Sequence, residues 1–353
     1  MDTISSSEST IAQTRSRRRK SGFVSWIKRV LLGLLVLITA MAALGAGYEA
    51  IMAAGDATRY PPPGRLVDVG GYKLHIQCMG MSSTGTPTVI LEASGGGTSL
   101  DWSRIQPELA TRLRVCSYDR AGHGWSDRGP EPRSPQRDAA ELHTLLANAG
   151  VRGPYVLVGH SYGGLVTRLY AQQHSADVAG MVLIDSMHEM AYTDAAFRQG
   201  RQQEDQMQAI NAFLDRLGMC RLFGASITVQ MLPRATQFPP ETRQLMCMFA
   251  MGPKRAGPTA SESMAADQTY AGLGAPGALE DMPLAVLAGE QMTTIAPFWQ
   301  AAQQHLAALS TNSLYTFVEG GEHFIHWQHP DLTINTIRQV VEAARTSRPL
   351  VSQ

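Results

Sequence analysis

Short apolar runs alternate with helical patterns from about residue 65 to residue 345, and this alternation constrains the fold most strongly. Apolar runs of this length predict buried strands, and the segments between them have the spacing of amphipathic helices. Repeated strand–helix units build a mostly parallel sheet with helices on both faces. We therefore expect an α/β fold, with strands over 66–69, 72–78, 88–92, 115–118, 155–158, 180–185, 283–288 and 314–318 and helices over 103–112, 135–149, 162–174, 298–309 and 331–345.

The alternation is interrupted between residues 187 and 281, a segment rich in polar helix formers and methionine. We interpret it as a helical cap over the strand ends, so that residues 65–186 and 282–347 form the core. Residues 181–292 contain 12 of the 17 methionines. Methionine adapts to irregular apolar surfaces, so it indicates either a hydrophobic substrate site or the filling of a loosely packed cap.

The first 64 residues predict a membrane anchor. Residues 1–29 contain seven basic and two acidic residues, and residues 30–47 contain no charge. A helix of about 20 apolar residues spans a bilayer, and a preceding basic cluster stays in the cytoplasm. We expect a basic cytoplasmic head over 1–29, a transmembrane helix and its exit over 30–54, and a stiff proline-rich linker over 55–64.

A cleaved signal peptide, which would release a secreted protein, is the alternative. Signal peptides usually have an apolar core of about 7–15 residues and a small-residue cleavage site. The apolar run here is longer, and Ala43-Leu-Gly45 is a marginal site. We therefore expect a single-pass membrane protein whose body after residue 64 lies outside the cytoplasm.

The four cysteines form no CxxC pair, which gives no support to a zinc ribbon or a thioredoxin-like site. Cys220 and Cys247 both lie in the expected cap and could form a disulfide in an oxidising compartment. The sequence leaves that pairing open. Cys78 and Cys116 lie in expected core strands, and we interpret them as small apolar residues.

The balanced charge argues against a nucleic-acid-binding protein, because such proteins usually carry a basic excess. Lysine and arginine together number 30, and so do aspartate and glutamate.

A candidate nucleophile lies between an expected strand and an expected helix. The motif there is Gly159-His-Ser161-Tyr-Gly163, a G-x-S-x-G pattern. In that context it predicts a tight turn that holds the serine in a strained conformation. The next helix begins at Tyr162, so its amide can donate to a developing oxyanion.

A serine nucleophile needs a base, and three histidines follow the last expected strand. We assign the base to His323, which comes soonest after the strand in a glycine-containing loop, with His326 as the alternative. If His326 is not the base, it fits a packed histidine, and His329 fits a surface histidine. His160, inside the serine motif, fits a packing residue. We expect no metal, because no nearby carboxylate or cysteine set completes a site at a recognisable spacing.

Four motifs resemble those of the α/β-hydrolase fold family, specifically its cap-bearing members, over residues 65–345. Segment 89–97 with Trp102 is similar to the family's oxyanion loop, and 118–126 to its D-x-x-G-x-G-x-S turn. Segment 157–164 is similar to the nucleophile elbow, and 321–330 to the histidine loop. The resemblance implies that Gly95 supplies the second oxyanion amide.

The catalytic acid departs from the commoner family pattern. Many members carry G-x-x-D where this chain has Gly289-Glu-Gln-Met292. Other members place the acid at the end of the preceding strand, where Asp185 stands. A carboxylate that ends an apolar strand needs a reason for its burial, whereas a loop glutamate does not. We therefore favour Asp185 over Glu290.

These features predict a membrane-anchored serine hydrolase, a carboxylesterase or lipase-like enzyme. It would cleave an ester or thioester of a small, hydrophobic substrate through an acyl-enzyme on Ser161. This chemistry needs no cofactor. The alternative is a non-catalytic receptor or scaffold that retains the fold, and the intact serine and histidine motifs speak against it. The sequence gives no oligomeric state.

Overall fold

Eight strands form one sheet in the structure, a computed structural model that describes residues 5–251 and 278–350. Only β1 with β2 and β2 with β4 pair antiparallel, and every other neighbouring pair is parallel. The expected mostly parallel sheet is therefore confirmed. Across the sheet, the order is β1 (Arg65–Asp68), β2 (Lys73–Met79), β4 (Val115–Tyr118), β3 (Thr88–Glu92), β5 (Tyr155–His160), β6 (Val178–Ile184), β7 (Leu284–Gly289) and β8 (Ser313–Val318).

Helices cover both faces of this sheet because successive strand residues point to opposite sides. In β5, Leu157 packs with α4 (Pro135–Asn148) and α5 (Tyr162–Gln173). Its neighbours Val156 and Val158 pack on the other face, with α3 (Gln106–Ala110) and α14 (Pro330–Thr346). Beside α5, the helix α12 (Trp299–Ala307) covers β6 and β7.

Two local elements differ from expectation. Of the helix expected over 103–112, only the short α3 forms, and the 3₁₀ turn η1 (Ser99–Trp102) precedes it. Glu290, expected in a loop, is instead the first residue of α11 (Glu290–Ile295). Two further short elements, η2 (Ser175–Asp177) and α13 (Ile325–Gln328), join longer ones.

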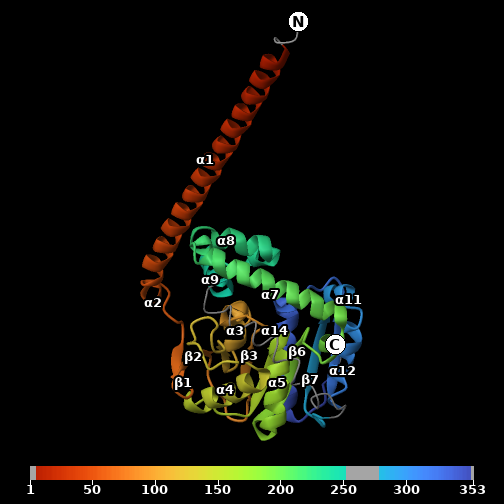
Figure 1. Cartoon of the computed structure of the whole chain (residues 1–353). Helices are drawn as coiled ribbons and strands as arrows, with labels where there is room; N and C mark the ends of the chain where they lie inside the picture. Colours follow the sequence, from red (N-terminus) through yellow and green to blue (C-terminus); the bar gives the residue numbers. More distant parts are fainter. Residues whose placement is uncertain (1–4, 252–277, 351–353) are drawn as a thin grey trace.

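Helices lie above the carboxyl ends of the parallel strands (Figure 1). The part of the expected cap at 252–277 lies outside the described residues. The described part, between β6 and β7, consists of α6 (Met190–Thr193), α7 (Ala195–Asp215), α8 (Met219–Met231), η3 (Pro233–Gln237) and α9 (Pro240–Met251).

A single long helix, α1 (Ser5–Ala53), leaves the body on the side of α7 and α8 (Figure 1). Its stretch Ser25–Ala53 is long and apolar enough to cross a membrane, with a mean hydropathy of 2.4 and none of its most apolar part buried. The expected apolar helix is therefore present, and it begins earlier than residue 30. The short helix α2 (Asp56–Arg59) follows, and the Trp125 indole donates to the carbonyl of Tyr60, 2.9 Å away.

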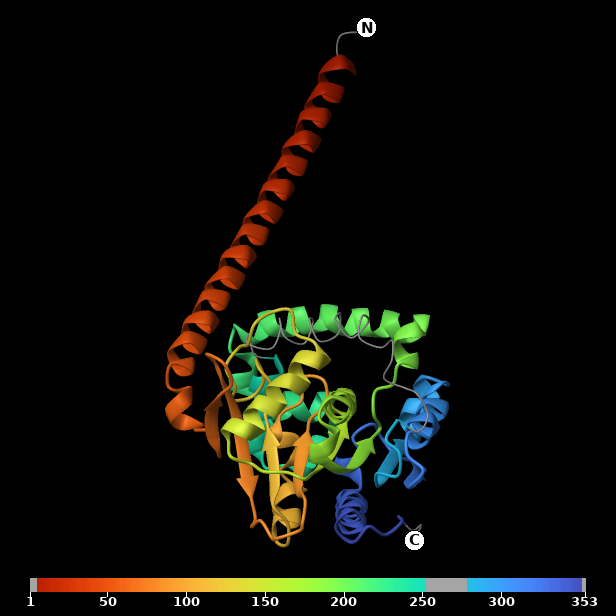
Figure 2. The same cartoon turned by 90° about the horizontal axis from the view of Figure 1, so that it is seen from below.

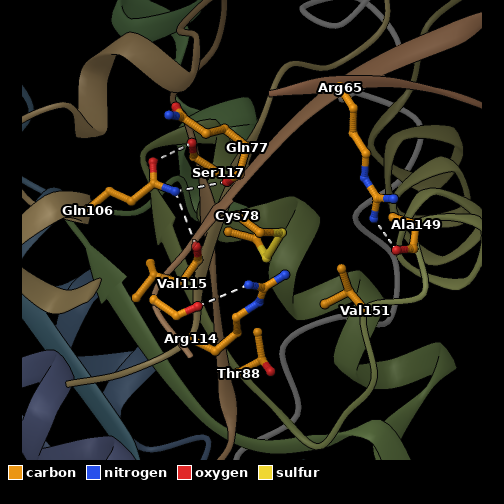
Figure 3. The surroundings of a disulfide bond; sticks show 12 residues. Arg65, Gln77, Cys78, Thr88, Gln106, Arg114, Val115, Ser117, Ala149 and Val151 are labelled. Atoms are coloured by element: carbon orange, nitrogen blue, oxygen red, sulfur yellow. Dashed lines mark hydrogen bonds between the residues drawn. A yellow bond between two sulfur atoms is a disulfide. The ribbon is translucent and has the colours of Figure 1, made fainter. Parts of the chain in front are cut away.

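All four cysteines are paired. Cys220 of α8 and Cys247 of α9 form a disulfide, the pairing that the sequence left open. Cys78 and Cys116, expected as separate apolar residues, also form a disulfide, so that interpretation is wrong (Figure 3). The physical reason is register: β2 and β4 run antiparallel with these two residues directly opposite, and their Cα atoms are 4.0 Å apart.

Candidate active site

Ser161 occupies a sharp turn between β5 and α5. Its φ of 54° and ψ of −121° lie outside the regions that non-glycine residues usually adopt. The amide of Ser161 donates to the carbonyl of Ile184 at 3.1 Å, which ties the turn to the neighbouring strand β6. The strained serine predicted from the motif is thus present in the backbone.

The glycines of the motif make this turn sterically feasible. A Cβ on Gly159 would lie 2.6 Å from the Gly163 carbonyl oxygen, closer than real Cβ contacts come. A Cβ on Gly164 would lie 1.8 Å from Oγ of Ser186. The chain after β5 can therefore turn sharply into α5 only where these positions lack side chains.

The structure brings His323 and Asp185 together from two different strand ends. The ring nitrogen Nδ1 of His323, in the loop after β8, lies 2.7 Å from Oδ2 of Asp185, which follows β6. The other carboxylate oxygen, Oδ1, accepts from the Gly289 amide at 3.1 Å and from the Trp299 indole at 2.7 Å. Asp185 is fully buried, and both of its oxygens have partners.

Glu290, the alternative acid, makes a different contact. It is exposed, and its Oε2 accepts from the amide of Gly320 at 2.6 Å. The neighbouring Gln291 accepts from the amide of His323 at 2.8 Å. Of the two candidate acids, Asp185 is therefore the one hydrogen-bonded to the His323 ring, and α11 supports the backbone of the histidine loop.

Two buried histidines pack around His323. His160 Nε2 lies 2.9 Å from the carbonyl oxygen of His323, and the two rings are 4.7 Å apart. His326 packs between His160 and Trp102, with ring separations of 4.6 and 4.7 Å. Burial lowers the pKa of His160 well below its usual range and that of His326 to about 3. Both rings are therefore neutral at pH 7.

Gly95 and Tyr162, the two expected oxyanion donors, lie next to each other. A Cβ on Gly95 would be 3.5 Å from Cβ of Tyr162, the first residue of α5. The loop that carries Gly95 is held by Arg120, whose guanidinium donates to the carbonyls of Ala93 and Ser94 at 3.0 and 2.7 Å. Arg120 also pairs with the buried Glu92 at 2.5 Å.

A mostly apolar cavity of about 130 Å³ borders the loop with Gly95. Most of the remaining wall comes from the cap and the histidine loop, so the cavity lies between the cap and the expected oxyanion loop. Residues that line it include Gly95, Met231, Met246, Phe249, Phe324 and Trp327.

Four functional contacts were not anticipated from the sequence. They are made by Trp299, Gln291, His160 and Arg120. Arg120 lies in a motif that pointed to the site, but nothing in that motif indicates which carbonyls it contacts. Trp299 lies in an ordinary helix pattern, and no spacing signal marks it.

Within the described ranges, one group could hold a metal ion: His143, His174 and Asp177, whose ligand atoms lie within 4.8 Å of one another. The two imidazole rings are stacked 3.8 Å apart, so their nitrogen lone pairs do not converge on one point. His174 follows the carboxyl end of α5, about 18 Å from the end that carries Ser161 at 1.5 Å per residue. The group therefore takes no part in the site around the serine.

Comparison with known proteins identifies a family. A sequence model described as "Alpha/beta hydrolase family" matches residues 89–336. The structure of a thermophilic esterase from Thermogutta terrifontis superposes with a TM-score of 0.59 and 20% identity, covering 80% of this chain and 99% of the esterase. At that identity the superposition shows a shared fold.

Curated relatives match over shorter segments. An uncharacterized vacuolar membrane protein of Saccharomyces cerevisiae is 33% identical over 133 residues, which is 33% of this chain and 21% of that protein. A (lyso)-N-acylphosphatidylethanolamine lipase of Bos taurus is 31% identical over 104 residues, 28% of this chain and 30% of the lipase. The chain spans about a fifth to two fifths of the first curated relatives it matches.

Proposed function

The chain belongs to the alpha/beta hydrolase family, and from that premise we propose that it is a membrane-anchored serine esterase. Ser161 is the nucleophile, His323 the general base and Asp185 the acid that orients the base. The substrate is an ester or thioester with a hydrophobic acyl or alcohol group.

The reaction follows from the arrangement of these groups. With Nδ1 of His323 bonded to Asp185, Nε2 is the nitrogen that accepts the Ser161 proton as Oγ attacks the substrate carbonyl. The amides of Gly95 and Tyr162 stabilise the negative oxygen that develops. Collapse breaks the ester bond, and the leaving alcohol takes the proton from His323. Water then repeats the sequence and releases the acid from the acyl-enzyme.

The observation that carries this proposal is the hydrogen bond of 2.7 Å between His323 and Asp185 beside the turn of Ser161. A carboxylate at that nitrogen fixes one tautomer and stabilises the imidazolium formed during catalysis. The donors at Oδ1 hold the carboxylate in place, since each hydrogen bond to a charged group contributes about 1.5–3 kcal/mol.

A hydrophobic substrate is supported by the mostly apolar cavity beside Gly95, whose wall includes three methionines and three aromatic residues. Such side chains favour an acyl chain or an apolar alcohol over a charged group. The bovine relative bears the name of a lipase, and the superposed thermophilic protein that of an esterase.

The membrane assignment rests on α1. Its apolar stretch follows the basic residues of the first 29 positions, so the amino terminus is cytoplasmic and the catalytic body extracytoplasmic. Two disulfides in the body support an oxidising compartment. The yeast relative is named a membrane protein.

Labelling with a fluorophosphonate probe tests the chemistry. We expect the full-length chain in detergent to react with the probe and to hydrolyse p-nitrophenyl esters, with a preference for longer acyl chains. Ser161→Ala should abolish labelling and most turnover, because loss of a triad member leaves only weak residual catalysis. Its folding should be retained, as judged by circular dichroism. Turnover near that of the wild type in Ser161→Ala would exclude the mechanism.

A further inference from the structure

The end of α1 is packed tightly against the turn between α7 and α8. A Cβ on Gly45 would lie 2.7 Å from the carbonyl oxygen of Leu217, and one on Gly218 would lie 3.2 Å from the ring of Tyr48. Gly45 belongs to the uncharged run of residues 30–47. The α7–α8 turn therefore lies at the level at which the anchor leaves its apolar stretch.

An arginine fixes this packing. The guanidinium of Arg221 in α8 makes two hydrogen bonds to Glu49 at the end of α1, at 2.6 and 2.7 Å. It makes two more to Asp56 in α2, both of 2.7 Å. The Arg221 side chain is only 7% exposed. These contacts set the height of the cap along α1, because two bidentate pairs allow little sliding.

We call the contact of α1 and α2 with the α7–α8 turn and Arg221 the joint. The cap carries exposed apolar side chains both before and after the joint along the chain. Three exposed apolar residues of α7, Met207, Ile210 and Phe213, are spaced three positions apart, which places them on one face of the helix. Two more lie on α8, just after the turn. Each of the five side chains is more than half exposed, and we call them the cap patch: Met207, Ile210, Phe213, Leu222 and Phe223. A group of exposed apolar side chains of this kind marks an interaction site.

The direction of α1 indicates what covers the cap patch. In both views α7 lies along the edge of the body on the side toward which α1 extends, and it runs across α1 rather than along it (Figures 1 and 2). A bilayer crossed by α1 therefore lies over α7 and α8. An amphipathic helix at that level buries its apolar face about 5–10 Å into the boundary between headgroups and acyl chains.

We propose that the cap patch inserts into the interfacial layer of the same membrane that α1 spans, so that the cap rests on lipid. This inference depends on the anchor in the proposed function and goes beyond it. The cavity beside Gly95 includes Met231, also on α8 and itself more than half exposed. The cap patch and one wall of this cavity therefore share the helix α8.

Single-cysteine fluorescence tests the contact. Since all four native cysteines are paired, one added cysteine can be labelled selectively with a polarity-sensitive nitrobenzoxadiazole dye under non-reducing conditions. The full chain is reconstituted into phosphatidylcholine vesicles with or without bromine-labelled acyl chains, which quench the dye on contact. The test positions are Phe213→Cys and, as an independent second site, Leu222→Cys.

Two reference positions make the outcome decisive. Leu37→Cys lies on the exposed apolar part of α1. Met81→Cys is 83% exposed and follows β2, whose antiparallel direction ends at the edge of the sheet opposite the cap. We expect blue-shifted emission and quenching by bromolipid at Phe213, Leu222 and Leu37, and neither at Met81.

The other outcomes overturn the inference in distinguishable ways. Quenching at Leu37 with no quenching at Phe213 and Leu222 would show that the anchor spans the bilayer while the cap patch stays in water. A blue shift at Phe213 and Leu222 without quenching would mean that protein, such as a second copy of the chain, covers the cap patch. No quenching at Leu37 would refute the anchor and this inference together.

Discussion

Asp185 combines an unfavourable backbone with a fully satisfied side chain. Its φ of 42° lies in the left-handed region, which a non-glycine residue occupies at a cost of about 1–3 kcal/mol. Its carboxylate is held by the His323 ring, the Gly289 amide and the Trp299 indole. Strain of this kind persists where the surroundings fix the residue, and it often occurs where a group must be aimed accurately.

Replacement of the two candidate acids should have unequal effects. Asp185→Asn keeps the volume of the side chain but removes the charge and favours the wrong histidine tautomer, so kcat should fall by up to about 10⁴. Glu290→Gln should change kcat by less than about threefold, since Gly320 can still donate to an amide oxygen. Steady-state ester hydrolysis measures both. A larger loss of kcat in Glu290→Gln than in Asp185→Asn would assign the acid to Glu290.

His326 should make the protein sensitive to acid. Its pKa is about 3 in the folded state and about 6.5 when unfolded, so only the unfolded chain takes up its proton between these values. The free energy of unfolding should therefore be highest above pH 6.5. It should fall as the pH drops toward 3, by up to about 1.4 kcal/mol per pH unit from this residue.

His326→Phe tests this contribution, because a phenyl ring can keep the packing against Trp102 and His160. Urea unfolding of the full chain in detergent at pH 7 and pH 5 is the measurement. The variant should lose about 1–2 kcal/mol less than the wild type between the two values. An unchanged difference between pH 7 and pH 5 would contradict a neutral buried His326.

Individual contacts around the site differ in how far the sequence could predict them. His323 and Asp185 each follow an apolar strand, and strand ends of a parallel sheet meet at one edge, so their proximity was predictable. The indole of Trp299 reaches Asp185 from a helix 114 residues later in the chain. Such a contact depends on how helices pack on the sheet, which strand and helix periodicities do not specify.

At the scale of elements, strands were the most predictable part because most are short apolar runs with clear ends. Which strands pair, and in which register, was harder to predict. Cys78 and Cys116 meet because β2 runs antiparallel to β4 in one particular register, and a shift of one residue would turn one sulfur to the opposite face. Apolar composition alone does not fix that register.

The joint between α1 and the cap gives a prediction at the same scale. Arg221→Gln removes the charge that pairs with Glu49 and Asp56, and it should destabilise the joint by about 1–3 kcal/mol. Burial and the nearby Glu49 raise the pKa of Asp215 to about 6, whereas Arg221 lowers it. Loss of the arginine therefore leaves these acidic groups without a compensating positive charge. Backbone amide hydrogen exchange in α8 should be faster in this variant than in the wild type.

Arg234→Gln provides the matched control. Arg234 also lies in the cap and pairs with Glu322 at 3.0 Å, but both side chains are more than a third exposed. Exposed pairs contribute about 0–1 kcal/mol, so exchange in α8 should hardly change. Equal effects of the two substitutions would mean that the joint does not stabilise the cap.

For the whole molecule, the anchor should determine fractionation. The full chain should sediment with membranes and stay there through washes at high salt, because salt screens surface charge but does not extract a spanning helix. Detergent should release it. Release by salt alone, measured by immunoblotting of the supernatant, would indicate peripheral binding and contradict the anchor.

The joint around Arg221 also decides where the chain can be cut to obtain a soluble enzyme. A form that begins at Ala57 would keep every motif around Ser161 yet lose both Glu49 and Asp56, the acceptors of all four hydrogen bonds. A form that begins at Tyr48 would keep both acceptors while discarding the apolar run. The final turn of α1 is thus better treated as the first segment of the folded body than as a disposable tether.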